Sequence, residues 1–229
     1  MATDPLLEEQ IAYYRARAGE YDEWFLRQGR YDQGPELNAR WRAELDEVVR
    51  ALEAFGPHGA VLELAGGTGW WTERLAGTAD ALTVVDASPE VLAISRARLG
   101  GDPRVRYVEA DLFAWRPDRR YDVVIFTYWL SHVPPARFGS FWAMVADCLA
   151  PTGRVFFVDN LAPSTTSSDH QPSHDGVTAT RRLNDGRAFR IYKLYYQPNE
   201  LAARLGRLGW AAEVRRTPSY FIYGSARPA

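Results

Sequence analysis

Residues 61–71, VLELAGGTGWW, join an apolar run to a cluster of glycines. An apolar strand that leads into a glycine-rich turn and then a helix is typical of proteins that bind a nucleotide-shaped cofactor. The glycines let the backbone turn tightly and approach the ligand closely. The chemistry to look for first is therefore that of a cofactor held at a strand-to-helix turn.

Two kinds of enzyme use such a turn. A nicotinamide oxidoreductase holds a pyrophosphate with the pattern G-x-G-x-x-G, in which the third glycine allows close contact between helix and strand. Counting from Gly67, the second glycine is Gly69, and the third position holds Thr72. The oxidoreductase pattern fails there, so the alternative, a methyltransferase that holds the amino-acid end of S-adenosylmethionine, is favoured.

Two carboxylates follow the turn at the ends of predicted strands. Asp86 closes the apolar run Ala81–Asp86, close to the spacing of about 20 residues expected of a carboxylate that binds ribose hydroxyls. Asp111 follows the next predicted strand, Val105–Glu109. Both kinds of enzyme use the first carboxylate, so Asp86 alone does not separate them.

The glycine turn carries a more specific pattern, E-x-A-x-G-x-G, formed by Glu63, Ala65, Gly67 and Gly69. It resembles motif I, E/D-x-G-x-G-x-G, of the class I S-adenosylmethionine-dependent methyltransferases. Ala65 replaces the first glycine, which is tolerable if the backbone there needs no positive φ. The stretches VVDASPE, VEADLFAW, FTYWLSHVPP and LAPTGRVFFVD follow in the family's order. The resemblance covers residues 60–159, and YYRARAGEYDEWF near the N-terminus is similar to the helical cap of small-molecule members.

The resemblance implies S-adenosyl-L-methionine as the cofactor and S-adenosyl-L-homocysteine as the product. It implies that Asp86 accepts hydrogen bonds from the ribose, that Asp111 accepts one from the adenine amino group, and that a backbone carbonyl of Phe126 or Thr127 meets the ammonium. The full set of expected cofactor-binding residues is Glu63, Ala65, Gly67, Gly69, Asp86, Ala87, Asp111, Leu112, Phe126, Thr127, Tyr13 and Arg17.

Methyl transfer from a sulfonium is an in-line displacement, so the enzyme must align the nucleophile with the methyl group in a dry pocket. Nearby aromatic faces stabilise the cationic sulfonium. An oxygen nucleophile also needs a proton acceptor, for which His132 is the first candidate, with Tyr14 and Tyr21 completing the expected catalytic set. The alternative is that His132 only packs the turn before Pro134. An amine or ring-carbon nucleophile would need a base less, so O-, N- and C-methylation stay open.

The expected substrate-binding residues follow the fourth strand or lie in the C-terminal part of the chain. They are Tyr128, Trp129, His170, His174, Arg182 and Tyr192. The chain holds 8 Trp, 12 Tyr and 10 Phe, which favours a small aromatic or apolar metabolite, such as one of specialised metabolism. Arg181, Arg182 or Arg190 could recognise a substrate carboxylate, although a solvated role suits any one of them. His170 and His174 have a spacing that suits a metal on a helix, but nearby Pro172 and Gly176 argue against a helix, so no metal is expected.

The net charge and the amino-acid composition limit which classes of partner the protein is expected to bind. The formal net charge of −2 gives no electrostatic footprint for nucleic acid or an anionic membrane. The one cysteine, Cys148, excludes an internal disulfide, and the N-terminus lacks the order of a signal peptide. We expect a cytoplasmic monomer or homodimer that acts on a small molecule. A non-catalytic protein that binds the cofactor on the same fold is the remaining alternative.

The elements that position these residues alternate between strand and helix, which predicts an α/β fold. With the resemblance, the expectation is a three-layer Rossmann-like methyltransferase fold. Its seven-stranded sheet is mostly parallel with an antiparallel C-terminal strand, and a helical cap precedes it. The 229 residues are expected to form one domain with four parts. These are a cap (1–55), a cofactor-binding core (60–159), a polar lid or substrate insertion without regular periodicity (160–187), and C-terminal strands and a helix (188–229).

Individual elements are predicted from apolar periodicity and from turn residues. The predicted helices are Leu6–Arg27, Ala39–Phe55, one from Trp70 or Trp71, one from Pro89, Pro135–Leu149 and Pro198–Leu208. The predicted strands are Ala60–Ala65, Ala81–Asp86, Val105–Glu109, Asp122–Thr127, Gly153–Asp159 and Ala188–Tyr196, with one or two more within Trp210–Ala226.

Overall fold

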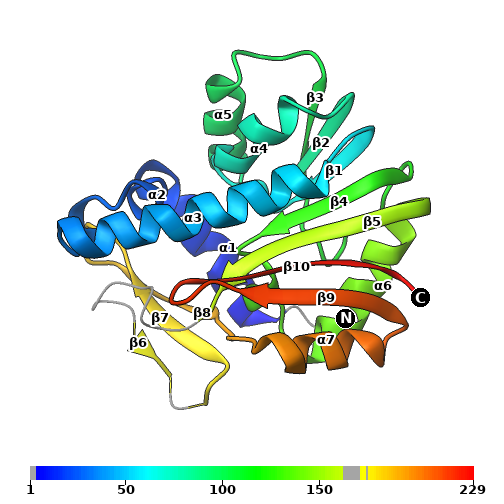
Figure 1. Ribbon diagram of the computed structural model, residues 1–229. Helices are drawn as coiled ribbons and strands as arrows, with labels where there is room; N and C mark the ends of the chain where they lie inside the picture. The colour runs from blue at the N-terminus through cyan, green and yellow to red at the C-terminus, as the bar shows by residue number, and fades with distance from the viewer. Residues whose placement is uncertain (1–3, 162–170, 174) are drawn as a thin grey trace.

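The computed structural model describes residues 4–161, 171–173 and 175–229. Its main sheet has seven strands in the order β3-β2-β1-β4-β5-β10-β9 (Figure 1). The strands are β1 (Ala60–Leu64), β2 (Ala81–Asp86), β3 (Val105–Glu109), β4 (Tyr121–Thr127), β5 (Leu149–Asn160), β9 (Trp210–Arg216) and β10 (Phe221–Pro228). Neighbours from β3 to β5 pair in parallel, and β10 pairs antiparallel with both β5 and β9. The mostly parallel sheet with one antiparallel C-terminal strand is confirmed.

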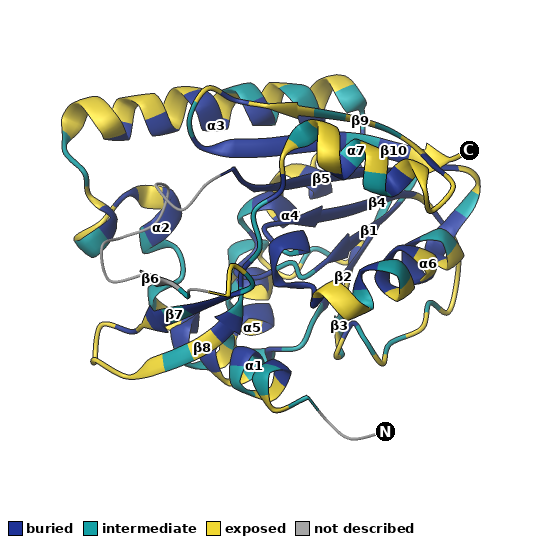
Figure 2. Ribbon diagram, turned by 90° about the horizontal axis from the view of Figure 1, so that it is seen from below, coloured by how far each residue is buried: buried dark blue, intermediate teal, exposed yellow. Residues whose placement is uncertain are grey.

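Helices cover both faces of this sheet and make the fold three-layered (Figure 1). On one face α3 (Pro35–Phe55), α4 (Trp70–Ala76) and α5 (Pro89–Arg98) contribute to one apolar cluster. On the other face α6 (Phe138–Cys148) and α7 (Pro198–Gly206) contribute to a second. Figure 2 shows the main-sheet strands largely buried between the helices, whereas the outer side of α3 is exposed. Parallel strands covered on both faces are expected to be mainly apolar, as β1 and β4 are apart from Glu63 and Asp122.

The N-terminal cap is not one helix from Leu6 to Arg27, as the periodicity predicts. It divides into α1 (Pro5–Arg17), a 3₁₀ turn (Ala18–Glu20), α2 (Glu23–Leu26) and a second 3₁₀ turn (Gly29–Tyr31). At the start of α1, Asp4 caps the helix by accepting the N–H of Leu6 at 3.0 Å. At the end of α2, Arg27 has a φ of 55°, and this left-handed conformation terminates the helix.

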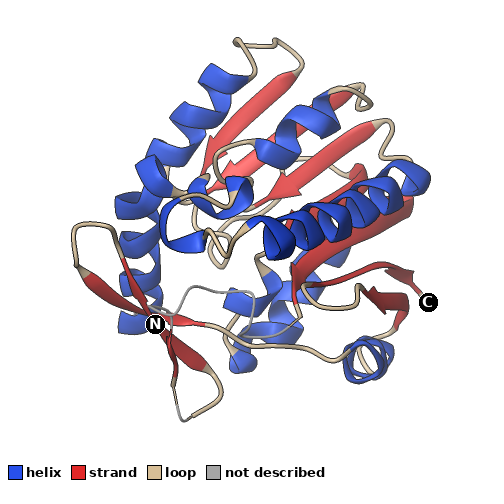
Figure 3. Ribbon diagram, turned by 60° about the vertical axis from the view of Figure 1, so that its left-hand side comes forward, coloured by secondary structure: helices blue, strands red, loops and turns tan. Residues whose placement is uncertain are grey.

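A second, three-stranded antiparallel sheet is formed by strands from the segment 160–187 and by the strand that follows it. It contains β6 (Gln171–Pro172), β7 (Thr178–Arg182) and β8 (Ala188–Tyr192), in that order. Thr178 and Arg181 are buried within β7, so buried and polar positions coincide and apolar alternation gives no signal. The small sheet projects away from the main sheet beside the cap (Figure 3), and β8 contacts α1.

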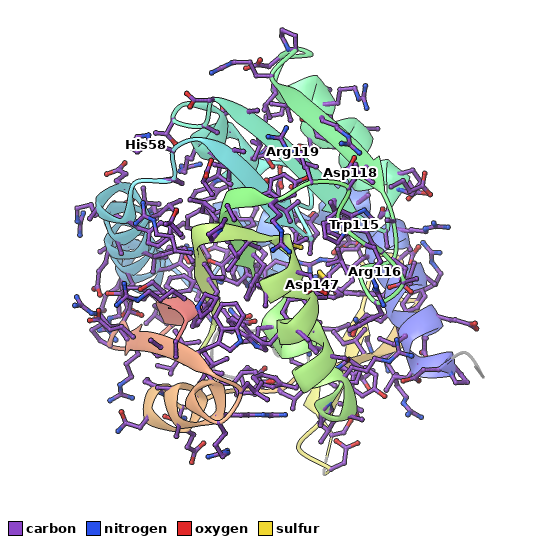
Figure 4. The ribbon with its side chains drawn as sticks, turned by 90° about the vertical axis from the view of Figure 1, so that its right-hand side faces the viewer. His58, Trp115, Arg116, Asp118, Arg119 and Asp147 are labelled. Carbon is purple, nitrogen blue, oxygen red and sulfur yellow. The ribbon has the colours of Figure 1, made fainter. Side chains whose placement is uncertain are left out.

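Several boundaries shift by a few residues. β5 begins at Leu149 and the strand predicted over Ala188–Tyr196 ends at Tyr192. Cys148 is fully buried, as a small core residue should be. His58 is exposed in the loop before β1 (Figure 4), at the end of that strand opposite the glycine turn.

No helix in the described part of the chain is long and apolar enough to cross a membrane.

Candidate active site

A cavity of about 730 Å³, its open mouth included, lies at the carboxyl ends of β1, β2 and β4. Open parallel sheets bind ligands at this edge, outside the carboxyl ends of their strands. The lining residues come from the strand ends and from the cap. They are Leu7, Gln10, Ile11, Tyr14, Tyr21, Ala65, Gly67, Asp86, Ala87, Ser88, Val91, Asp111, Leu112, Phe113, Thr127, Tyr128, Trp129 and His132.

The glycine turn forms one wall of this cavity. Gly67 and Gly69 have φ values of 56° and 88°, which favour glycine. Ala65, the residue that departs from motif I, has a φ of 55°, so the condition of a negative φ at this position is not met. The Ala65 N–H donates to the Val85 carbonyl at 2.7 Å, and this bond holds the strained turn in place.

Glu63 lies beneath the turn rather than in the cavity lining. Its carboxyl is almost fully buried and accepts a hydrogen bond from Thr72 Oγ1 at 2.6 Å. Burial raises the pKa of Glu63 to about 8. The Thr72 that breaks the oxidoreductase pattern therefore serves as the partner of the motif I carboxyl, and the two residues join the strand to α4.

Asp86 is the carboxylate that faces the cavity. Its two oxygens accept the N–H of Gly67 at 3.0 Å and the N–H of Ser88 at 2.9 Å, so the side chain is fixed in orientation. Burial raises the pKa of Asp86. Each oxygen keeps lone-pair capacity for a ligand donor. Asp111 and Leu112, predicted to bind the adenine, also line this cavity.

The residues expected to bind the cofactor divide into those that line this cavity and those that do not. Ala65, Gly67, Asp86, Ala87, Asp111, Leu112 and Thr127 line the cavity. Glu63, Gly69, Phe126 and Tyr13 do not, and Arg17 lines a neighbouring cavity instead. The Phe126 side chain does not line the cavity because side chains alternate along a strand, and this one packs with Phe141 and Phe157 in the core. Neither Trp70 nor Trp71 is a lining residue; Trp70 stacks on Phe25 of the cap.

These residues fit S-adenosylmethionine. The fixed Asp86 carboxylate suits the two ribose hydroxyls, and a Cβ at Gly66 would collide with Val84, so the turn accepts only a glycine backbone there. Apolar Leu112 and Phe113 border the end of the cavity near Asp111. When bound, the cofactor supplies an electrophilic methyl group on a sulfonium.

A second cavity of about 470 Å³ adjoins the first. It is lined by Tyr14, Arg17, Tyr21, Trp24, Tyr128, His132, Asn160, Arg181 and Lys193. Tyr14, Tyr21, Tyr128 and His132 belong to both linings. These four residues form the junction between a cofactor cavity and a cavity that could hold a substrate.

The cap docks onto the glycine turn through Tyr21 and Asp22. The Tyr21 ring lies against Gly67, where an added Cβ would be 3.5 Å from its hydroxyl. Thr68 Oγ1 donates to Asp22 Oδ1 at 2.5 Å, and Arg98 of α5 pairs with the other Asp22 oxygen. Arg17 lies over the Tyr21 ring at 4.8 Å. The cap thereby connects the cofactor turn to the second cavity.

His132 and Tyr14 form a hydrogen-bonded pair at the junction. His132 Nδ1 is 2.7 Å from the Tyr192 carbonyl, which can only accept, so Nδ1 carries the proton. Nε2 then accepts the Tyr14 hydroxyl at 2.8 Å. Burial, assisted by the charge of Lys193, lowers the pKa of His132 well below its ordinary value, and burial raises that of Tyr14. His132 is thus a neutral imidazole at pH 7.

Three cations surround the second cavity. Arg17 and Arg181 are buried, and within the described residues neither has a carboxylate ion pair. Lys193 is buried as well; its ammonium donates to Ser131 Oγ at 2.7 Å and to Asn160 Oδ1 at 2.9 Å, and Asp159 lies 3.5 Å away. Burial lowers the pKa of Lys193 to about 8. None of the nine lining residues is acidic.

Only some of the residues predicted to bind the substrate line the two cavities. Tyr128 lies at the junction and Trp129 in the cofactor cavity. Tyr192 contributes its carbonyl to His132, while its hydroxyl donates to Asp4 outside both linings. Arg182 is exposed, and it is the preceding Arg181 that lines the cavity. His170 and His174 fall outside the described residues.

Lys193 and Asn160 line the second cavity and are absent from the expected set. Lys193 directly follows β8 and Asn160 is the last residue of β5, which is a weak positional signal in the sequence. In the described part of the chain, no group of three or more His, Cys, Asp or Glu side chains could hold a metal ion.

The sheet order, the glycine turn and the carboxylate at the end of β2 define a class I methyltransferase. A family model described as a methyltransferase domain matches residues 61–153. DhpI has been solved as a complex with SAH and as a complex with SAM and HEP, and it is 40% identical to this chain. The two matches cover 100% of this chain and 99% and 100% of those chains, with TM-scores of 0.79 and 0.80. The chain belongs to the S-adenosylmethionine-dependent class I methyltransferases, and S-adenosylmethionine is its cofactor.

Two curated relatives match over shorter stretches. Nodulation protein S of Sinorhizobium fredii is 26% identical over 125 residues, 53% of this chain and 57% of the relative. Demethylmenaquinone methyltransferase of Clavibacter sepedonicus is 32% identical over 104 residues, 45% of this chain and 42% of the relative. The matches thus span about half the length of these relatives.

Proposed function

We propose that the protein transfers the methyl group of S-adenosylmethionine to an oxygen of a small anionic metabolite, a carboxylate or a phosphorus oxyacid. The observation that carries the proposal is the pair of buried guanidiniums, Arg17 and Arg181, with no carboxylate ion pair among the described residues. A buried charge without a partner is costly, so such groups are normally paired. A substrate anion would supply the missing countercharge.

Other features of the second cavity support an anion rather than the aromatic or apolar substrate favoured by composition. Lys193 adds a third cation, and Asn160 Nδ2 is a buried donor without a partner among the described residues. Guanidiniums bind carboxylates and phosphorus oxyanions through paired N–H groups. The aromatic residues that composition counts lie mainly in the core and at the wall shared by the two cavities.

An anionic oxygen also suits the chemistry available at the junction. His132 would have to become an imidazolium to act as the general base, and burial with the nearby charge of Lys193 opposes this. An oxygen that is already deprotonated needs no base. We therefore propose that His132 orients the Tyr14 hydroxyl instead of accepting a proton from substrate. Tyr14, Tyr21 and Tyr128 close the junction against water.

A thermal-shift titration tests the substrate class. With S-adenosylhomocysteine bound, short alkyl carboxylates and alkyl phosphates are expected to raise the melting temperature further, because they bind only the folded state. The matched primary amides and neutral phosphate triesters are expected to have no effect. An equal rise with the neutral compounds would contradict the proposal. NAD(H) serves as a control that should not stabilise the protein.

The rate is expected to depend on pH through Lys193. Its ammonium, which attracts the anion, is present below a pKa of about 8 and is lost above it. With a carboxylate substrate, kcat/KM should therefore fall as the pH rises through about 8. In Lys193→Arg this fall should disappear, because a guanidinium stays charged there. An unchanged alkaline fall in Lys193→Arg would show that another group is responsible.

A further inference from the structure

Tyr128 has an unusual backbone conformation for its side chain. It follows β4 directly and has a φ of 55°, the left-handed region that bulky residues rarely adopt. Its N–H donates to the Val158 carbonyl at 2.7 Å, so pairing with β5 continues through the strained residue. Such strain persists where the surrounding structure enforces it, and it is concentrated at functional sites. The position of this side chain is therefore strongly determined.

The Tyr128 ring is held by aromatic neighbours from three parts of the chain. Trp24 and Phe25 of the cap contact it with ring centroids 4.7 Å and 5.6 Å away. Phe221 of β10 lies at 6.2 Å and Trp71 of α4 at 6.5 Å. These contacts leave the ring little freedom to rotate away. Tyr128 lines both cavities, so its ring is fixed at their junction.

The hydroxyl of Tyr128 lacks a hydrogen-bond partner among the described residues, although the side chain is about nine-tenths buried. Leaving a buried hydroxyl unpaired is unfavourable. At the same junction, Tyr14 and His132 are already engaged with each other, since the Tyr14 hydroxyl donates to His132. Of the four shared lining residues, Tyr128 thus combines an enforced position with an unused donor.

We propose that the Tyr128 hydroxyl is a catalytic group that donates a hydrogen bond to the substrate oxygen that receives the methyl group. This inference rests on the proposed function. The substrate oxygen contributes a lone pair to the new O–C bond, the C–S bond breaks with its electron pair on sulfur, and no proton is transferred. Tyr128 keeps its own proton throughout. Its role is to place the reacting oxygen at the junction, between the cations and the cofactor cavity.

Tyr128→Phe tests the proposal, with Tyr196→Phe as the matched control. Tyr196 is also buried with a hydroxyl that has no partner among the described residues, but it packs against Phe138 and lines neither cavity. Calorimetry with inorganic phosphate on the S-adenosylhomocysteine complex should show a dissociation constant about tenfold higher for Tyr128→Phe and unchanged for Tyr196→Phe. The melting temperature of uncomplexed Tyr128→Phe should equal or exceed that of the wild type, because an unpaired buried hydroxyl is removed.

Unchanged phosphate affinity in Tyr128→Phe would overturn the inference while leaving the proposed function intact. A melting temperature lowered in Tyr128→Phe but not in Tyr196→Phe would assign the hydroxyl a structural role and would also overturn it. The proposed function fails separately, and the inference with it, if the wild type and Arg181→Gln bind phosphate equally. The Tyr128→Phe result therefore tests the role of the Tyr128 hydroxyl only if Arg181→Gln is found to lose phosphate binding.

Discussion

Replacing Arg181 by Gln is expected to lower kcat/KM for the acid substrate about 100-fold, the equivalent of about 2.7 kcal/mol. Arg181 is buried, lines the second cavity and has no carboxylate ion pair in the described part of the chain. Gln keeps a polar side chain of similar reach but removes the charge and the paired N–H groups. The loss should appear mainly as a raised KM, because the interaction holds the anion in both ground and transition states. Initial rates over a range of substrate concentrations separate the two constants.

The adjacent Arg182 provides the matched control. Its side chain is exposed on β7, outside both linings, and only its carbonyl contacts the cap, through Arg30. Arg182→Gln should leave kcat and KM unchanged. Thermal stability offers a second readout, since removing a buried charge without a partner should not lower the melting temperature. Equal losses in both variants, or a large drop in the stability of Arg181→Gln, would show that Arg181 has a structural role.

Replacing Asp86 by Ala is expected to weaken binding of S-adenosylhomocysteine at least about 100-fold. Hydrogen bonds to a charged acceptor contribute about 1.5–3 kcal/mol each, and the ribose offers two donors. Asp86 also fixes the turn through Gly67 and Ser88, so the variant loses orientation as well as contacts. Calorimetric titration of the purified protein measures the dissociation constant directly.

Asp80, an exposed residue just before β2, is the control for a charge change beside the same strand. Asp80→Ala should bind the product as the wild type does. Asp86→Asn, which retains the side-chain volume, should fall between the two. Wild-type affinity in Asp86→Ala would remove this carboxylate from the cofactor site and with it the fit described for the first cavity.

The sequence predicted the strands and helices of the cofactor-binding core well because local rules govern them. The glycine turn, the strand that ends at Asp86 and the helix capped at Ser88 each depend on a few neighbouring residues. The parallel order of the strands follows from alternating strand and helix patterns. The failure of the third glycine at Thr72 separated the two cofactor classes, and Thr72 proves to bond Glu63. Ala65 was the exception, since its positive φ is imposed by the turn and not by its own preference.

The second cavity could not be predicted in the same way. Arg17 comes from the cap, Asn160 from the end of β5, and Arg181 and Lys193 from the small sheet or just after it. They meet because these three parts of the chain pack against one another. β7 buries Thr178 and Arg181 as well as Ala179, so it carries no apolar periodicity, and the choice between Arg181 and Arg182 depends on the strand's register. The composition shows that the chain is rich in aromatic residues. It does not show that many of these residues pack in the hydrophobic core instead of lining a substrate site.

Product analysis with matched compounds tests the central claim most directly. The wild-type protein is incubated with S-adenosylmethionine and, in parallel, with short carboxylates, alkyl phosphates or alkylphosphonates and with their neutral amides or esters. Formation of S-adenosylhomocysteine is quantified and the methylated product is identified by mass spectrometry and NMR. We predict turnover of one class of acid, a methyl ester of that acid as the product, and none with its neutral analogue. Methylation of the neutral compounds at equal or higher rates would contradict the assignment of the second cavity to an anion.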